Sequence, residues 1–360
     1  MNNEIIELGK LGLEKWFHDK LDNSKLSDYH LARVITVNKN NYIISNGRND
    51  IYAELTGKFI FSTDSTMDFP TVGDWVYVQL FDDESFAVIN GIVPRKSLLK
   101  RKTSGKKIEY QLIASNIDTA LIMQSLDSNY NIRRLERYLV MVNDSNIQPV
   151  VLLSKSDLAA TDEIEKKKAD IYNAMPGICI LTFSNNNIDE LNRLREIFIP
   201  GITYCLLGSS GVGKTTLINK LINKEQFKTR EIREKDGRGK HTTTRRELIV
   251  LENGAMIVDN PGMRELGMIS VESGLDDTFS EITALSNKCR FNDCTHTVEK
   301  GCAILNALEG EIISKERYRN YIKMHKESLY YEMTYVEKRH KDKKFGKYVH
   351  SIMKHKKDKG

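Results

Sequence analysis

A phosphate-binding motif lies near the middle of this 360-residue sequence. Residues 208–215 read GSSGVGKT, which satisfies G-x-x-x-x-G-K-[ST], between the strand-like run TYCLL and the helix-like run TLINKLI. In such a loop, backbone N–H groups surround phosphate oxygens at the positive end of a helix. We expect Lys214 to contact the β- and γ-phosphates and Thr215 to bind Mg²⁺. The alternative is a glycine-rich turn that binds nothing.

Two further segments carry groups suited to Mg²⁺ and the γ-phosphate. Asp259 closes the apolar run MIVD and opens the pattern D-x-x-G, which ends at Gly262. The acid can hold the Mg²⁺ shell and the glycine N–H can contact the γ-phosphate, whereas the alternative is an ordinary Asp-Asn-Pro-Gly turn. Residues 236–247 (DGRGKHTTTRRE) are typical of a loop that closes on a bound γ-phosphate. We expect one of Thr242, Thr243 and Thr244 to be a second Mg²⁺ ligand, with Thr243 as the candidate.

A base-reading motif, Ser154-Lys155-Ser156-Asp157, follows the apolar run VVLL and differs from N-K-x-D at its first residue. An acid that accepts hydrogen bonds from N1–H and the exocyclic amine selects guanine over adenine, so Asp157 predicts a guanine nucleotide. The loss of asparagine removes one contact to the base and one to the phosphate loop, which predicts weaker affinity. A surface turn is the alternative interpretation of these four residues.

The order of the motifs differs from that of ordinary GTPases. The base-reading motif comes before the phosphate loop and D-x-x-G, and no N-K-x-D occurs after Gly262. We therefore predict a circularly permuted G domain, an arrangement that is tolerated where the new termini lie at the surface.

A metal-binding pattern follows, with four ligands within 14 residues. They are Cys289, Cys294, His296 and Cys302. A closed Cys₃His set is a standard structural zinc site with no position left for a catalytic water, so we expect one Zn²⁺ per chain. The alternative is a group of buried free thiols. The other two cysteines, Cys179 and Cys205, lie in apolar runs and are expected in the core.

These motifs require a multidomain scaffold. Short alternating strands before the first motif predict an OB-type β-barrel. The alternation of strand and helix patterns around the motifs predicts an α/β P-loop GTPase domain, and the cysteine-bearing end predicts a helical zinc-binding domain. The expected segments are a helical extension (1–28), the barrel (29–100), the permuted G domain (103–268), the zinc-binding domain (269–335) and a basic tail (336–360). Residues 94–107 are expected to be a basic linker. Five barrel aromatics are candidates for base stacking or for the core: Tyr42, Tyr52, Phe61, Trp75 and Tyr77.

Composition narrows the class of protein. Hydrophobic residues make up 40% and charged residues 29% of the chain, and its apolar runs are shorter than the roughly 18 residues that a membrane helix needs. No secretory signal precedes the first motif, so we expect a cytoplasmic protein without a membrane partner. Residues 337–360 hold ten Lys or Arg and three acids, a local charge of +7 against +5 for the whole chain. This run predicts either contact with a nucleic-acid backbone or a solvated helix end.

The combination of barrel, GSSGVGKT, GKHTTT, DNPG before MREL, CRFNDCTH, EKGCAI and the KRHKDKKFGK tail resembles the RsgA family of GTPases, also called YjeQ. The resemblance runs over nearly the whole chain from the barrel onward. It implies a GTPase that is stimulated by the small ribosomal subunit and acts late in the maturation of that subunit. It also implies that the barrel and the zinc domain contact rRNA, with GTP or GDP, Mg²⁺ and Zn²⁺ as cofactors. We expect the protein to be a monomer.

The resemblance assigns residues to roles. The nucleotide-binding set is Ser154, Lys155, Ser156, Asp157, Gly208, Ser209, Ser210, Gly211, Val212, Gly213, Lys214, Thr215, Thr216, Asp259 and Gly262. Lys214 and His241 are the catalytic candidates. His241 resembles a family histidine proposed to position water, and a solvated loop histidine is the alternative. The chain departs from the family at Ser154, and it has only Thr182-Phe183-Ser184 where a Ser-Ala motif is expected near the base.

Two other functions stay open. One is a nucleotide-gated rRNA-binding module whose hydrolysis is vestigial. The other is an ATP-dependent P-loop protein that remodels RNA, against which Asp157 argues.

Overall fold

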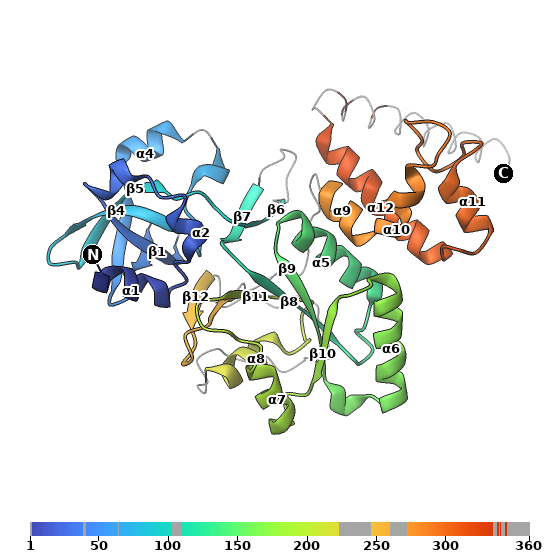
Figure 1. Ribbon diagram of the computed structural model, residues 1–360, viewed down its shortest axis with the longest axis horizontal. Coiled ribbons are helices and arrows are strands. Elements are labelled where there is room, and N and C mark those ends of the chain that lie inside the picture. Colours follow the sequence, from blue (N-terminus) through green and yellow to red (C-terminus); the bar gives the residue numbers. More distant parts are fainter. Residues whose placement is uncertain are drawn as a thin grey trace, which may run out of the picture. The chain divides into compact units, whose positions relative to one another are not determined.

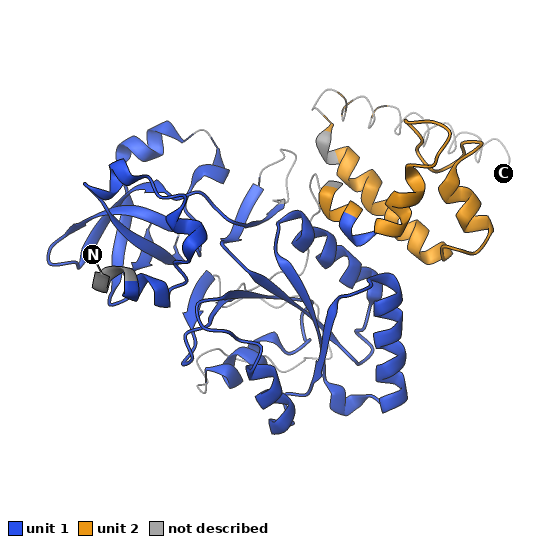
Figure 2. Ribbon diagram, in the orientation of Figure 1, with its two compact units in different colours: residues 1–267, 277–279 blue, residues 268–276, 280–360 orange. Residues whose placement is uncertain are grey.

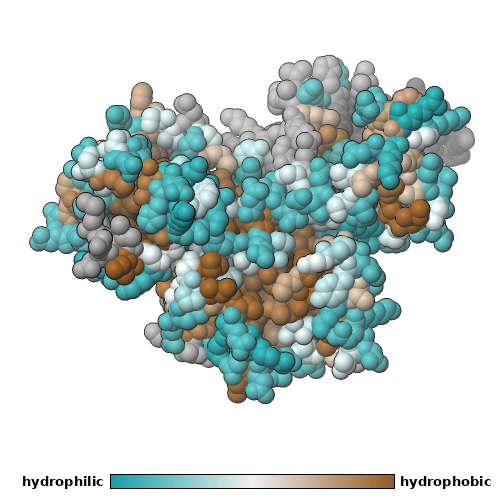
Figure 3. Space-filling view, in the orientation of Figure 1, coloured by the Kyte–Doolittle hydropathy of each residue, from teal (hydrophilic) through white to brown (hydrophobic). Residues whose placement is uncertain are grey.

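The computed structural model describes residues 2–38, 41–63, 65–102, 110–222, 246–259 and 272–333, with residues 337, 339 and 343. The chain forms two compact units, Met1–Gly267 with Asp277–Phe279 and Met268–Asp276 with Ser280–Gly360 (Figure 2). Hydrophilic residues predominate on the face of the protein drawn in Figure 3. Across the described ranges, no helix is both long enough and apolar enough to cross a membrane.

A closed five-stranded barrel begins the first unit (Figure 1). Its strands are β1 (His30–Val37), β2 (Tyr42–Ser45), β3 (Asp50–Leu55), β4 (Trp75–Phe81) and β5 (Phe86–Ile92). Strand β1 pairs with both β2 and β4, which closes the barrel, and β5 lies between β3 and β4. Helix α4 (Gly57–Ser62) and the 3-10 turn η1 (Thr66–Asp68) connect β3 to β4. Of the five aromatic candidates for stacking, Tyr42, Trp75 and Tyr77 are buried and only Tyr52 and Phe61 are exposed.

The N-terminal extension packs against this barrel as three short helices. They are α1 (Asn2–Lys10), α2 (Lys15–His18) and α3 (Asn23–Leu26). Gly12 separates the first two with φ +82°, and a Cβ there would lie 2.6 Å from the Gly201 carbonyl oxygen. Only glycine therefore fits this turn. The extension buries Leu8, Leu11, Leu13 and Phe17 against Leu31, Trp75, Tyr77 and Val93.

Part of the expected basic linker is a β-hairpin instead. Strand β6 (Leu98–Lys102) pairs antiparallel with β7 (Tyr110–Ser115). The prediction of a linker over residues 94–107 was wrong because this strand shows almost no apolar alternation in the run KSLLKRK. Leu99 is fully buried, whereas Lys100 and Arg101 are only partly buried, so backbone pairing rather than burial supports the strand.

A mainly parallel sheet forms the rest of the first unit. Its strands are β8 (Thr119–Ser125), β9 (Gln148–Ser154), β10 (Cys179–Phe183), β11 (Thr203–Leu207), β12 (Arg246–Val250) and β13 (Met256–Asp259). The spatial order is β10-β9-β8-β11-β13-β12, and only β12 is antiparallel to its neighbour. The helices are α5 (Ile132–Asp144), α6 (Thr161–Ala174), α7 (Ile188–Arg195) and α8 (Lys214–Leu221).

Helices cover both faces of this sheet (Figure 1). Leu121 and Met123 on β8 belong to the core that α7 and α8 complete. Ala120 and Ile122 alternate with them along the strand and are also fully buried, so they face the opposite side, where α5 packs on β8 and β9. The predicted α/β architecture is confirmed.

Strand β12 continues the sheet into the barrel. It pairs with β13 on one side and with β1 on the other, where Thr36 faces Glu247 and Val37 faces Arg246. The barrel and the sheet therefore share one continuous run of eleven hydrogen-bonded strands.

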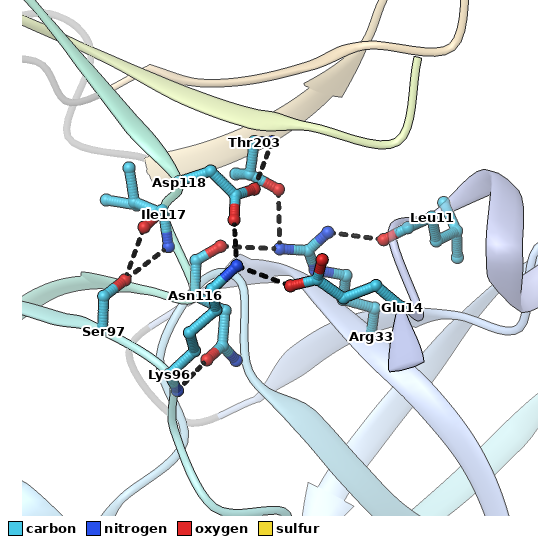
Figure 4. A network of polar contacts seen from close by, with 9 residues as sticks. All are labelled: Leu11, Glu14, Arg33, Lys96, Ser97, Asn116, Ile117, Asp118 and Thr203. Carbon is cyan, nitrogen blue, oxygen red and sulfur yellow. Dashed lines mark hydrogen bonds and ion pairs between the residues drawn. The ribbon is translucent and has the colours of Figure 1, made fainter. Parts of the chain in front are cut away.

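A buried arginine ties the extension, the barrel and the sheet together (Figure 4). Arg33 on β1 is 1% exposed, and its guanidinium donates to the carbonyl oxygens of Leu11, Gly73 and Asn116 and to Thr203 Oγ1 at 2.9 Å. Burial lowers the pKa of Arg33 to about 10, so the side chain is still charged at neutral pH. Next to it, Lys96 pairs with Glu14 at 2.6 Å and with Asp118 at 2.8 Å.

The second unit is helical in its described part. Helices α10 (Ser280–Ser286), α11 (Ala303–Glu309) and α12 (Lys315–Glu332) follow α9 (Glu272–Thr278), whose last two residues belong to the first unit. Gly310 caps α11 and separates it from α12. Arg317 on α12 pairs with Glu281 on α10 at 2.8 Å. The basic tail lies almost entirely outside the described residues.

Candidate functional site

The phosphate motif forms the turn between β11 and α8. Strand β11 ends at Leu207 and helix α8 begins at Lys214, so residues 208–213 make the loop between them. Gly213 caps the helix with φ +97°, a backbone conformation that side chains disfavour. Lys214 Nζ donates to the carbonyl oxygens of Gly208 at 2.6 Å and Ser209 at 2.8 Å, so its ammonium group lies over the loop. Thr215 and Thr216 follow in the first turn of the helix.

The base-reading motif lies directly beside this loop. Ser154, at the end of β9, is fully buried, and its Oγ donates to the Val212 carbonyl oxygen at 2.7 Å. The expectation that serine loses the contact to the phosphate loop was therefore wrong, because the hydroxyl reaches a carbonyl oxygen of that loop. Lys155 adopts φ +60°, and its Nζ pairs with Asp127 at 2.7 Å.

Asp157 is held by the loop that follows β10. A hydrogen bond from the Ser184 hydroxyl lowers the pKa of the Asp157 carboxyl below its usual value, so the group is ionised and can accept hydrogen bonds. Asn186 Nδ2 lies 3.4 Å from Asp157 Oδ2. Thr182 and Phe183 are the last two residues of β10. In the region where a Ser-Ala motif was expected, Ser184 is therefore the residue that contacts the base-reading motif.

Glu190, on α7, joins the two base-side loops and was not identified from the sequence. Its Oε2 accepts from Ser156 Oγ at 2.7 Å and from the Ser184 backbone N–H at 2.6 Å. One carboxylate oxygen therefore fixes the spacing between residues 154–157 and 184–186.

Asn129 is a second site residue to which no sequence motif pointed. Its Nδ2 donates to Ser209 Oγ at 3.1 Å and to the Ser210 carbonyl oxygen at 3.3 Å. The loop after β8 thus supports the phosphate loop from the side opposite β13 in the strand order.

Asp259 ends β13, the parallel neighbour of β11. Burial raises the pKa of its carboxyl, the Lys214 charge opposes that rise, and Glu247 adds to it. Asp259 and Lys214 are therefore electrostatic neighbours at the carboxyl end of the sheet, where a divalent cation would favour the ionised acid. Gly262, His241 and Thr243 lie outside the described residues.

The four metal-ligand candidates lie together in the second unit. Their ligand atoms are all within 4.8 Å of one another. His296 Nδ1 lies 3.6 Å from the sulfurs of Cys289 and Cys302, and these two sulfurs are 3.8 Å apart. A tetrahedral Zn²⁺ with bonds of about 2.3 Å to sulfur and about 2.0 Å to nitrogen requires edges of about 3.5–3.8 Å. The three distances among Cys289, His296 and Cys302 match these edges, and the Cys294 sulfur lies within 4.8 Å of the other three ligand atoms.

The surroundings of His296, Cys289 and Cys302 favour the metal-binding forms of these three ligands. Burial lowers the pKa of His296, which favours the neutral imidazole. The backbone N–H groups of Ala303 and Leu305 point to the sulfurs of Cys289 and Cys302 at 3.4 and 3.5 Å. Such contacts stabilise thiolates.

The two remaining cysteines differ in position. Cys205 is fully buried, as predicted, and burial raises the pKa of its thiol to about 12. The prediction for Cys179 was wrong, since it is exposed at the start of β10, the edge strand of the sheet.

Comparisons with known proteins agree on one family. The family model RsgA GTPase matches residues 92–269. A protein of Vibrio parahaemolyticus named small ribosomal subunit biogenesis GTPase RsgA 2 is 34% identical over 346 residues, which cover 96% of this chain and 92% of that protein. RsgA 2 of Lactiplantibacillus plantarum is 40% identical over 309 residues, 86% of each chain, and RsgA 1 of Bacteroides thetaiotaomicron is 35% identical over 358 residues, 99% of each.

Two solved structures share the fold. The crystal structure of YjeQ from Thermotoga maritima has a TM-score of 0.59 at 24% identity and covers 83% of this chain and 98% of that one. The structure of YloQ, described as a circularly permuted GTPase, has a TM-score of 0.59 at 23% identity and covers 85% and 97%. The predicted circular permutation is confirmed, because the base-reading strand β9 precedes the phosphate-loop strand β11 in the chain.

Proposed function

Because the chain belongs to the RsgA family of GTPases, we propose that it hydrolyses GTP while bound to the small ribosomal subunit during maturation of that subunit. The proposal includes binding to the small ribosomal subunit because the names of the relatives refer to biogenesis of this subunit. The observation that carries the nucleotide part is the 2.7 Å hydrogen bond from Ser154 to Val212, which joins the base-reading motif to the phosphate loop.

In this proposal the base and the phosphates are held by different loops. The ionised Asp157 accepts from guanine, and residues 208–216 surround the phosphates with N–H groups. Lys214 turns from the loop carbonyls to the β- and γ-phosphates, where its charge stabilises the transferring phosphoryl group. Thr215 and Asp259 would hold Mg²⁺, which supplies further stabilisation of negative charge. Gly262, Thr243 and the water-positioning role of His241 remain predictions from the sequence.

The zinc unit and the tail are proposed to contact rRNA. Cys289, Cys294, His296 and Cys302 would bind one Zn²⁺, whose role is to fix the helical unit rather than to catalyse a reaction. The charge of the basic tail suits a phosphate backbone. We also propose that the protein acts as a monomer in the cytoplasm, where its ribosomal partner is assembled.

Single-turnover GTP hydrolysis with and without purified small subunits tests the proposal. We expect subunits to accelerate hydrolysis and Lys214→Ala to slow it on the order of 100-fold, since that substitution removes one transition-state contact. Lys220→Ala is the matched control, because Lys220 is an exposed lysine near the other end of α8. Hydrolysis that subunits do not change would contradict the ribosomal part of the proposal.

Two further measurements separate the alternatives. Competition by ATP as strong as that by GTP would favour the ATP-dependent interpretation. Subunit cosedimentation that depends on nucleotide, without any stimulated hydrolysis, would favour the nucleotide-gated binding module.

A further inference from the structure

Asn185 lies between the two halves of the nucleotide site and has no assigned role. It follows β10, whose last residue, Phe183, pairs with Ser154 in the sheet, so Asn185 lies just beyond the end of the base-reading strand. We propose that the Asn185 carboxamide donates a hydrogen bond to N7 of the bound guanine and so supplies the amide that Ser154 lacks. This inference rests on the proposed function, because it requires a guanine nucleotide in this site.

The carboxamide of Asn185 lies against the phosphate loop. A Cβ placed on Gly213 would lie 2.9 Å from Asn185 Nδ2, so the amide fills the space beside that glycine. The Ser154 hydroxyl bonds to Val212, the residue immediately before. The side chains of residues 154 and 185 thus reach consecutive residues, one from the end of β9 and the other from the loop after the adjacent strand β10. A serine at position 154 carries no amide, and Asn185 brings one to the same loop.

The same carboxamide is incompletely hydrogen-bonded. Asn185 Oδ1 is buried and has no hydrogen-bond partner. A half-turn about χ2 exchanges the oxygen and the amine of such a group, so either atom can occupy the buried position. With the amine there, the group can donate to a ligand, and its oxygen then lies beside Gly213. An unpaired buried polar atom is energetically unfavourable, so a ligand that supplies the missing hydrogen-bond partner would stabilise this side chain.

Guanine offers the complementary atom. N7 and O6 are both acceptors, and they lie on the base edge away from the N1–H and amine that Asp157 reads. The two contacts have different consequences. Asp157 selects guanine over adenine, whereas a donor to N7 adds affinity for either purine without selecting between them. Asn185 is therefore predicted to affect affinity, while base preference depends on Asp157.

The test compares GDP with 7-deaza-GDP, in which a C–H group replaces N7 and nothing else changes. Equilibrium titrations of the full chain should give the wild-type protein about five- to tenfold weaker binding to 7-deaza-GDP, the effect of one lost hydrogen bond. Asn185→Ala should bind GDP as weakly as the wild type binds 7-deaza-GDP, and it should no longer distinguish the two ligands. Asn192→Ala is the matched control, since its exposed side chain bonds only to Arg195 on the same helix among the contacts described.

A swapped pair strengthens the test. Ser154→Asn combined with Asn185→Ala returns the amide to its usual position and should restore the discrimination between GDP and 7-deaza-GDP. Equal binding of the two ligands by the wild type would overturn the inference, as would full discrimination by Asn185→Ala. The ligand comparison in the wild type needs no variant, so misfolding of a variant cannot mask the result. A wild-type protein that binds no guanine nucleotide at all would overturn the proposed function itself.

Discussion

Replacement of Glu190 by alanine tests whether the two base-side loops act as one binding surface. Glu190 Oε2 accepts from both Ser156 and Ser184, at 2.7 and 2.6 Å, and the alanine variant removes both bonds. The loop residues keep their own chemistry, including Asp157, so any change in affinity reflects the positions of the loops.

The size of the effect follows from the lost bonds. A hydrogen bond to a charged group contributes about 1.5–3 kcal/mol, so two bonds at the lower figure hold the loops with about 3 kcal/mol. When only a fraction of molecules has both loops in place, the apparent Kd rises by the inverse of that fraction. Loss of one effective bond then weakens GDP binding about tenfold, and loss of both about 150-fold.

The assay is a fluorescence titration with a labelled GDP at fixed Mg²⁺, alongside thermal unfolding. Glu196→Ala provides the control, because Glu196 is an exposed acid at the C-terminal end of the same helix. A Kd for Glu190→Ala within threefold of the wild-type value would refute the reasoning, since the loops would then hold their positions without this carboxylate.

Three further predictions concern the base, the metal and the joint between barrel and sheet. Asp157→Asn should shift preference from GTP toward XTP, because the amide presents a donor where guanine also donates, and unchanged GTP binding would show that another residue reads the base. Cys294→Ala should lose zinc, measured by metal analysis, and C-terminal helical signal, measured by circular dichroism, because metal binding at a closed site stabilises the fold. Cys179→Ala, which changes an exposed cysteine, should keep both. Arg33→Met should lower the free energy of unfolding by about 2–4 kcal/mol, because buried carbonyl groups lose their donor, and denaturant melts of the exposed Arg48→Met provide the comparison.

Motifs could be read from the sequence wherever the chemistry depends on residues close together in the chain. The phosphate loop, Asp157 and the Cys₃His set are of this kind. Contacts between side chains of different elements could not be predicted from the sequence. Asn187-x-x-Glu190 has the pattern of a capping box, in which the acid would return to the N–H of Asn187, but Glu190 accepts from Ser184 instead. Nothing local distinguishes these two outcomes.

The N-terminal extension illustrates a second reason. Its apolar spacing predicted helix, and helices form on both sides of Gly12. The break between them depends on the close approach of Gly201, which lies almost 190 residues further along the chain. Helix propensity makes glycine unfavourable by only about 1 kcal/mol, so the sequence could indicate a weak point but not a turn.

The barrel is attached to the nucleotide-binding sheet at two separate places, and this limits how far a bound nucleotide can change the orientation of the barrel. Strand β12 pairs with β1 on one side and on the other with β13, where Glu247 faces Asp259. In the middle of β1, Arg33 bonds to Thr203, the first residue of the phosphate-loop strand β11. Hinge motion needs a few residues free to change φ and ψ, and a strand bonded into both bodies with a buried guanidinium beside it offers none. The barrel should therefore move with the sheet as one body. A change at the γ-phosphate is therefore not expected to reorient the barrel on the sheet.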